Sequence, residues 1–194
     1  MKKAVVMAAL VVMLLPVAPL ASDRRESDDA TDTVRAHSNG YQVVPSQNSA
    51  GSSRFRARVD RHAKTIEYEL SWQDLKGDIL QSHIHFGRRA TNGDIVAFLC
   101  TNLGNTPPSA TPAPTCQGPR EGMVHGVLRA GDIVALAFAG IQPAQQLLPF
   151  SDFDEFANAI EAGATYVVVH TKAQPPGELR GQIHGRDHHA QHSR

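Results

Sequence analysis

The 194-residue sequence contains only two cysteines, one tryptophan and three tyrosines. Two cysteines are too few for a disulfide-dense miniprotein or for a zinc site built from clustered cysteines. The few tyrosine and tryptophan rings offer little surface on which nucleic-acid bases or sugars could stack. Lysines and arginines number 19, as do aspartates and glutamates, so the chain lacks the basic excess usual in nucleic-acid-binding proteins. We therefore expect no nucleic-acid partner.

The sequence also lacks the motifs of common enzyme classes. It has no Gly-x-Ser-x-Gly elbow, phosphate-binding loop, dinucleotide fingerprint or His-Glu-x-x-His pair, so we expect no enzymatic activity. Twelve prolines and fifteen glycines indicate many turns between short elements. Ten histidines are an unusual number for this length.

The first 21 residues have the three-part layout of a secretory signal peptide. A basic head at residues 1–3 precedes an apolar run over residues 4–15 and a stretch of small residues that ends at Ala21. The apolar run is shorter than the ~20 residues that cross a bilayer, which favours a signal peptide over a membrane span. After the signal peptide is removed, we expect no stable membrane span. A permanent N-terminal anchor is the alternative. We expect a protein exported to the periplasm or the medium, where disulfides persist.

Two further segments are polar. Residues 22–40 show no apolar periodicity and predict a disordered leader, with a charged docking arm as the alternative. Residues 185–194 predict a flexible, histidine-rich tail, in which His188, His189 and His192 could gather metal ions weakly. The folded domain is expected over residues 41–184.

Two segments near the start of this domain have the period-two pattern of half-buried strands. Apolar residues alternate with arginines over residues 54–59 and with polar residues over 65–72, and the five residues between them suit a hairpin. The apolar faces match only if the numbers of facing residues have an odd sum. A sum of 125 pairs Val59 with Ile66 and Phe55 with Leu70, and places Arg58 opposite Glu67 on the wet face.

The rest of the domain predicts more short strands and one helix. Helical spacing of Phe153, Phe156 and Ile160, with a cap at Ser151 and a stop at Gly163, indicates a helix in a crossover connection. About eight or nine short strands with one short helix predict an all-β sandwich or barrel. The further strands are expected over residues 79–86, 94–99, 123–128, 132–138, 165–171 and 178–184.

Cys100 and Cys116 flank a loop rich in proline and threonine. In an oxidising compartment we expect a disulfide between them, because the loop has no hydrophobic anchors of its own. Two free thiols on a metal ion are the alternative.

Residues 81–87, QSHIHFG, place His83 and His85 on the same face of a strand. Two imidazoles in this arrangement can chelate copper or zinc. The alternative is that both pack or form hydrogen bonds within the sheet.

Four motifs in order carry a family resemblance: H-I-H-x-G from His83, N-G-D-I-V-A-F-L from Asn92, Y-V-x-V-H-T from Tyr166, and P-G-E-L-R-G-Q-I from Pro176. This order resembles the CHRD domain, the module repeated in chordin and found singly in exported bacterial proteins. The resemblance covers residues 41–184. It implies an immunoglobulin-like β-sandwich or barrel that acts as a binding module outside the cytoplasm, without established catalysis. The chain departs from the family pattern at residues 43–46, at Val168, and in the Cys100–Cys116 loop.

If the His-x-His strand lies near the strand of His170, then His83, His85 and His170 supply three nitrogen ligands and leave one metal position open. This outline is similar to the copper site of Cu/Zn superoxide dismutase, which is also a β-sandwich. His125 is the candidate for a fourth ligand. Glu178 and Arg180 share a face of the last strand, and we interpret them as a structural pair that holds the hairpin.

Three functions follow in order of preference. The first is an exported, non-catalytic CHRD-type module that binds an unknown macromolecule or surface component outside the cytoplasm. The second is a β-sandwich that binds copper or zinc through His83, His85 and His170. A redox enzyme is the third.

Overall fold

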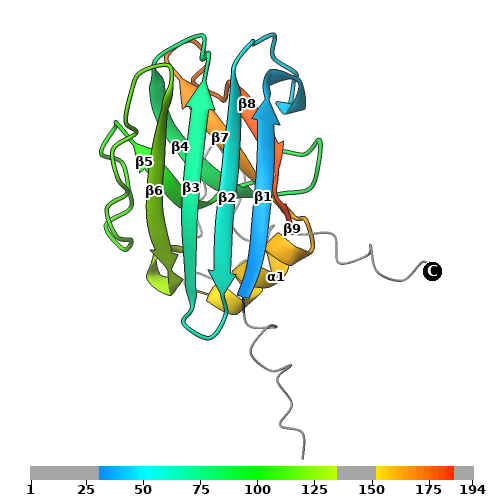
Figure 1. The fold of residues 1–194 in the computed structure, drawn as a ribbon, viewed down its shortest axis with the longest axis vertical. Coiled ribbons are helices and arrows are strands. Elements are labelled where there is room, and N and C mark those ends of the chain that lie inside the picture. The colour runs from blue at the N-terminus through cyan, green and yellow to red at the C-terminus, as the bar shows by residue number, and fades with distance from the viewer. Residues whose placement is uncertain (1–30, 135–151, 186–194) are drawn as a thin grey trace, which may run out of the picture.

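The computed structural model describes residues 31–134 and 152–185. These residues form nine β-strands, two short 3-10 helices and one α-helix (Figure 1). The strands are β1 (Thr31–Asn39), β2 (Ser52–Asp60), β3 (Thr65–Gln73), β4 (Ile79–Phe86), β5 (Ile95–Thr101), β6 (Gly122–Arg129), β7 (Thr165–Thr171), β8 (Leu179–Gln182) and β9 (His184–Gly185). The helices are η1 (Gly40–Gln42), η2 (Ala130–Asp132) and α1 (Phe153–Glu161).

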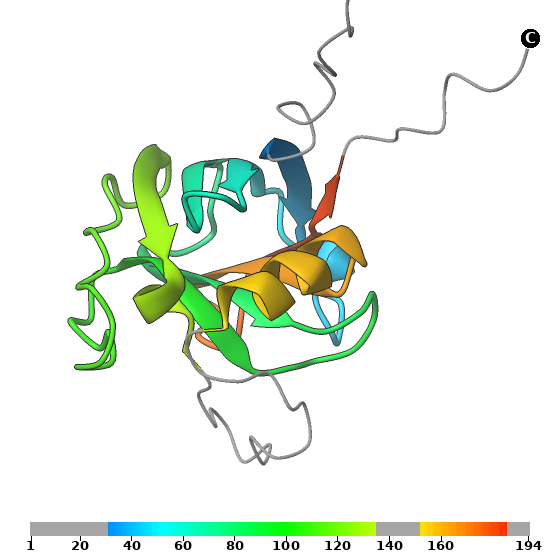
Figure 2. The ribbon, with the colours of Figure 1, turned by 90° about the horizontal axis from the view of Figure 1, so that it is seen from below.

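All the strands belong to one antiparallel sheet that curls into two layers. Its order is β5-β4-β7-β8-β1-β2-β3-β6, and β9 pairs with the free part of β1. β1, β2, β3 and β6 form one layer, and β4, β5 and β7 lie in the other (Figure 2). The two ends of the sheet approach each other, and the Tyr68 hydroxyl on β3 donates to the Leu99 carbonyl on β5 at 2.6 Å. The predicted all-β sandwich or barrel is therefore confirmed.

The first hairpin has the predicted register. Phe55 faces Leu70, Val59 faces Ile66, and Arg58 faces Glu67. The alternation buries the apolar side chains of β2 and β3 and exposes the charged ones. A slip of one residue would turn every apolar side chain to solvent, so the side-chain pattern requires an odd sum, and the short turn between Asp60 and Thr65 goes with the observed sum of 125.

The helix lies across one end of the two layers (Figure 2). Phe153, Phe156 and Ile160 are its buried face and join the main core. Its N-cap is Asp152, whose side chain accepts from the Glu155 backbone N–H, and not the predicted Ser151, which lies outside the described residues. The helix itself and its place in a crossover, between β6 and β7, are confirmed.

The predicted disordered leader is wrong for residues 31–39, which form β1. This strand pairs with β2 along its whole length and with β8 and β9 on its other side. Val34, Ala36 and Ser38 alternate as buried residues, so the strand has period two. Because two of these three side chains are small or polar, the alternation carries almost no hydrophobic signal.

Two other strand predictions need correction. Asp132 lies in η2, and no strand covers residues 132–134, while 135–138 fall outside the described part of the chain. Asp132 accepts from the backbone N–H groups of Arg129 and Thr111, which favours a turn over an extended strand. The expected strand over residues 178–184 is divided into β8, which pairs with β7, and β9, which pairs with β1.

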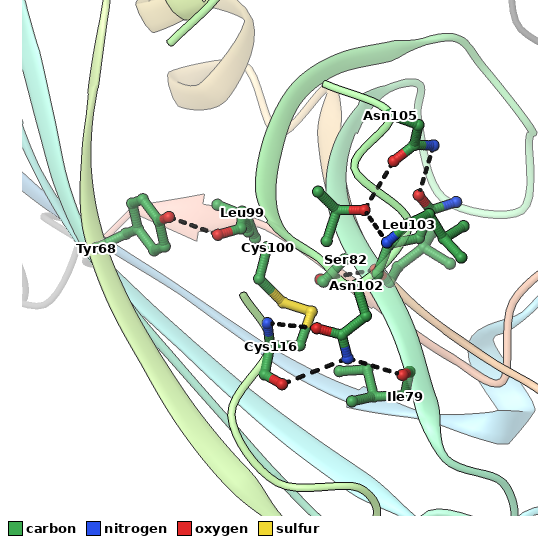
Figure 3. Close-up of a disulfide and its surroundings, with 12 residues drawn as sticks. Tyr68, Ile79, Ser82, Leu99, Cys100, Asn102, Leu103, Asn105 and Cys116 are labelled. Atoms are coloured by element: carbon green, nitrogen blue, oxygen red, sulfur yellow. Dashed lines mark hydrogen bonds between the residues drawn. A yellow bond between two sulfur atoms is a disulfide. The ribbon is translucent and has the colours of Figure 1, made fainter. Parts of the chain in front are cut away.

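Cys100 and Cys116 form the predicted disulfide. Both residues are buried at the edge of the main core. The Asn102 side chain lies between the loop and β4: it donates to the Ile79 carbonyl and accepts from the Cys116 backbone N–H, at 3.1 Å in both cases (Figure 3). The loop is thus attached to the sheet by the disulfide and by the hydrogen bonds of the Asn102 side chain.

Candidate metal centre

The two histidine-bearing strands are neighbours in the sheet. β4 pairs with β7 so that Gln81 faces His170 and His83 faces Val168. Facing residues project to the same side of a sheet, as do residues two apart on one strand. His83, His85 and His170 therefore share one face, and the opposite face contributes Ile84 to the main core.

The three imidazoles meet on this face. One ring nitrogen from each lies within 4.8 Å of the other two. His83 Nδ1 and His170 Nε2 lie 3.2 Å apart, which is also hydrogen-bond distance. Two nitrogens bound to one zinc or copper ion in tetrahedral geometry lie about 3.3 Å apart, because each metal–nitrogen bond is about 2.0–2.1 Å long. The three rings therefore lie together on one face, with the His83–His170 pair at this spacing and the whole cluster within the wider limit of 4.8 Å, and metal binding by them stays a prediction.

His125 is not part of this cluster. It lies on β6, opposite Glu69 of β3, and is exposed on the far side of the other layer. The suggested fourth ligand is therefore wrong, because β6 and β4 belong to different layers. His188, His189 and His192 lie outside the described residues.

Backbone carbonyls orient two of the rings. His85 Nδ1 lies 2.9 Å from the Gly93 carbonyl oxygen, and His170 Nδ1 lies 2.9 Å from the Pro175 carbonyl oxygen. A carbonyl oxygen only accepts, so both Nδ1 atoms carry the proton and both Nε2 atoms hold a lone pair. Metal-binding histidines are commonly held in this way, with the second nitrogen donating to a carbonyl or a carboxylate.

Burial keeps the three rings neutral. Desolvation lowers the pKa of His85 to about 3 and lowers the pKa of His83 well below its usual value. The pKa of His170 is also lowered by burial, although its hydrogen bond to Pro175 opposes the shift. Neutral imidazole is the form that coordinates a metal ion, so these rings need lose no proton first at neutral pH.

These directions predict a pH response of the metal-free protein. Histidines of the unfolded chain titrate near pH 6.5, whereas the folded rings bind their protons at lower pH. Between the two values the unfolded state holds more protons, so stability should fall as the pH drops below about 6.5. NMR should show no titration of the His85 ring between pH 7 and pH 5, and the His83 and His170 rings should titrate at lower pH than histidines of the unfolded chain. Movement of all three with a midpoint near 6.5 would contradict the buried arrangement.

Two ring nitrogens of the cluster have no hydrogen-bond partner among the described residues. These are His83 Nε2 and His85 Nε2, and both atoms are buried. A buried polar atom left unpaired costs on the order of 1–3 kcal/mol, so native structures rarely contain one without a reason. A bound ion or ligand that accepts one of these lone pairs supplies such a reason.

The cluster borders a cavity of about 330 Å³. The three histidines, Tyr166 and Arg180 contribute to its lining, and much of the rest comes from loops at residues 43–44, 92–93 and 175–176. This volume is at the lower end of the range for small-molecule sites. No local pattern distinguishes Tyr166 from the other buried residues of β7, so its place in the cavity wall could not be predicted.

Glu178 and Arg180 do not form the predicted pair. The Glu178 carboxylate accepts from Ser49 Oγ and from the Lys76 backbone N–H, at 2.6 Å in both cases. Arg180 Nη2 donates instead to the Arg88 carbonyl at 2.9 Å. Each side chain does bind backbone groups, but the two side chains bind different ones, and Glu178 precedes β8.

A comparison with known protein families shows the family to which this chain belongs. The model of the family described as CHRD domain matches residues 34–183. The chain belongs to the CHRD domain family. No curated protein and no solved structure matches it. The match begins within β1, before the predicted domain start at residue 41, which agrees with the correction to the leader.

Membership in the CHRD family supports a binding module of the extracellular type. The Cys100–Cys116 disulfide agrees with this, since such bonds persist in oxidising compartments. Within the described residues, no helix has the length and apolar character needed to cross a membrane. The predicted signal peptide, residues 1–21, lies outside the described part of the chain.

Proposed function

We propose that this CHRD domain is an exported, non-catalytic module that binds one copper or zinc ion through His83, His85 and His170. The observation that carries the proposal is the convergence of three imidazoles, of which His83 and His170 are buried and His85 is half-buried, with one ring nitrogen of each within 4.8 Å of the others. The absence of catalysis follows the general character of the family. A macromolecular partner outside the cytoplasm stays a separate prediction.

The hydrogen bonds of the cluster favour metal binding over simple packing. Histidines that only fill a core would be expected to use all their polar atoms within the protein, as His83 Nδ1 and His170 Nε2 do by bonding to each other at 3.2 Å. Here His83 Nε2 and His85 Nε2 are buried without a partner among the described residues. The carbonyls of Gly93 and Pro175 hold two of the rings in the tautomer that presents Nε2.

The donor set selects the class of metal. Three imidazoles suit copper and zinc, whereas calcium and magnesium prefer oxygen ligands. Three protein ligands leave a position free for water or a small ligand, as in zinc sites that are not purely structural. Between the two ions, Cu(II) should bind more tightly, following the general order of affinities for nitrogen sites.

Calorimetric titration of the purified, metal-free protein tests the proposal. We expect one Cu(II) or Zn(II) per chain with a sub-micromolar Kd. His83→Ala and His170→Gln should each weaken binding by at least about 100-fold, because each removes one of three ligands. His125→Gln is the matched control, since this exposed histidine lies in the other layer and should leave Kd unchanged.

A deletion of residues 186–194 separates the cluster from the histidine-rich tail. The deletion should leave the tight site intact. Binding that disappears with the tail but survives His170→Gln would assign the metal to the tail and refute the proposal. An intact protein without sub-micromolar binding would refute it as well.

A further inference from the structure

Arg180 is a buried cation in the wall of the same cavity. It lies on β8 opposite Val168 of β7, which in turn faces His83 of β4, so the three residues form one row across the sheet. Its exposed fraction is 3%. Its guanidinium carbon lies 3.7 Å from the centre of the Tyr166 ring. Tyr166 also stacks against His85, with ring centres 5.0 Å apart, so one aromatic ring contacts both the cation and a proposed metal ligand.

The charge of this guanidinium is not balanced by the surrounding described residues. Arg180 forms no ion pair with any of them. Nη2 donates to the Arg88 carbonyl, but Nη1 is buried and has no hydrogen-bond partner in the described part of the chain. Guanidinium stays charged in proteins, and a buried charge without a partner is costly.

The neighbourhood adds positive charge. Burial lowers the pKa of Arg180, and the interaction with Tyr166 opposes this shift. The positive charge of Arg89 lowers the pKa further, so a second cation lies nearby. Among the described residues that line the cavity, none is an aspartate or a glutamate. A metal ion at the histidines would make the same space more positive still.

We propose that the cavity binds a small carboxylate ligand, whose carboxylate pairs with Arg180 beside the metal ion. This inference rests on the proposed function for the metal next to the ligand. A carboxylate can accept from Nη1 and so satisfy the unpaired donor. The cavity volume of about 330 Å³ suits a small molecule and excludes a folded partner. The open position of a metal bound by three histidines gives the same ligand a second point of attachment.

Titration of the wild-type protein with acetate tests the proposal, with neutral acetamide as the matched probe. We expect acetate to bind the metal-free protein, to bind the Cu(II)-loaded protein more tightly, and to exceed acetamide by at least tenfold in both forms. Arg180→Met should weaken acetate binding by about tenfold or more, the loss expected when a charge-assisted hydrogen bond is removed. Circular dichroism confirms that the variant is folded.

Arg180→Lys keeps a charge and provides a second variant. It should bind acetate with an affinity between those of the wild type and Arg180→Met, because an ammonium lacks the planar fork of guanidinium. Equal binding of acetate and acetamide by the wild type, in both forms, would overturn the inference without any variant.

Metal binding and acetate binding are measured separately, so the proposed function and this inference can fail independently. If the protein binds acetate through Arg180 but takes up no copper or zinc, the proposed function fails and the anion site stands alone. If it binds the metal but shows no acetate preference, the metal site stands and this inference fails.

Discussion

Glu178→Gln should lower the free energy of unfolding by about 3 kcal/mol. The Glu178 carboxylate is fully buried and accepts four hydrogen bonds. Its donors are the Ser49 and Thr171 hydroxyls and the backbone N–H groups of Lys76 and Gly77. A neutral amide presents an NH2 group to donors that need an acceptor, so buried donors are left unpaired. Urea unfolding followed by circular dichroism measures the loss.

The position of Glu178 explains why one side chain matters so much. Its donors come from the loop before β2, the connection between β3 and β4, and the end of β7. These segments are far apart in the sequence, and Glu178 itself lies just before β8. The carboxylate therefore joins four parts of the chain near the cavity of the proposed metal centre.

An acid titration adds a second check on Glu178. Burial alone would raise its pKa, but the hydrogen bonds from Ser49, Lys76, Thr171 and Gly77 outweigh burial and lower the pKa. A carboxyl with a lowered pKa stabilises the fold above its unfolded value and loses that contribution as the pH falls through the folded value. The difference between wild type and Glu178→Gln should thus narrow in acid.

Glu121→Gln is the control for Glu178→Gln. Glu121 is exposed just before β6, and such surface changes usually alter stability by no more than about 0.5 kcal/mol. If Glu178→Gln changes stability as little as this control does at neutral pH, the carboxylate does not hold the four segments together.

Removal of the disulfide is the second large effect. The double substitution Cys100→Ala and Cys116→Ala should cost about 3 kcal/mol on the chain-entropy model, because the bond joins residues 16 positions apart. The reduced wild-type protein should lose a similar amount. Denaturant unfolding of the oxidised, reduced and double-variant proteins compares the three states.

Asn102 would still attach the loop to β4 in the double variant, so we expect the protein to remain folded. Ser109→Ala, at an exposed site of the same loop, is the control and should leave stability unchanged within about 0.5 kcal/mol. A double variant as stable as the oxidised wild type would show that the hydrogen bonds alone hold the loop.

The disulfide loop is also hydrogen-bonded to a residue that lines the cavity. Asn105 in this loop donates to Gln81 Oε1 at 2.9 Å, and Gln81 lines the cavity on the strand of His83 and His85. Metal titration of the reduced protein would show whether the loop supports the histidine cluster as well as the fold.

Local patterns were sufficient for several parts of this protein. The alternation over residues 54–59 and 65–72 limited the first hairpin to registers with an odd sum, and the short connection between the two segments favours the observed sum of 125. The spacing of Phe153, Phe156 and Ile160 determined the helix. The two cysteines determined their own bond, since the described chain offers no other partner. Each of these rests on residues close together in the sequence.

Only the tertiary structure decided which distant strands are neighbours. Strand β1 was hidden because its inward residues, such as Ala36 and Ser38, have little hydrophobic signal, and its position comes from backbone pairing on both sides. The meeting of His170 with His83 depends on β7 pairing with β4, which no local pattern determines. Arg180 binds the Arg88 carbonyl and Glu178 binds Ser49 and Lys76, and these partners too come from segments that no local pattern places together. Periodicity says which face a side chain occupies, but the order of strands in the sheet determines what it meets there.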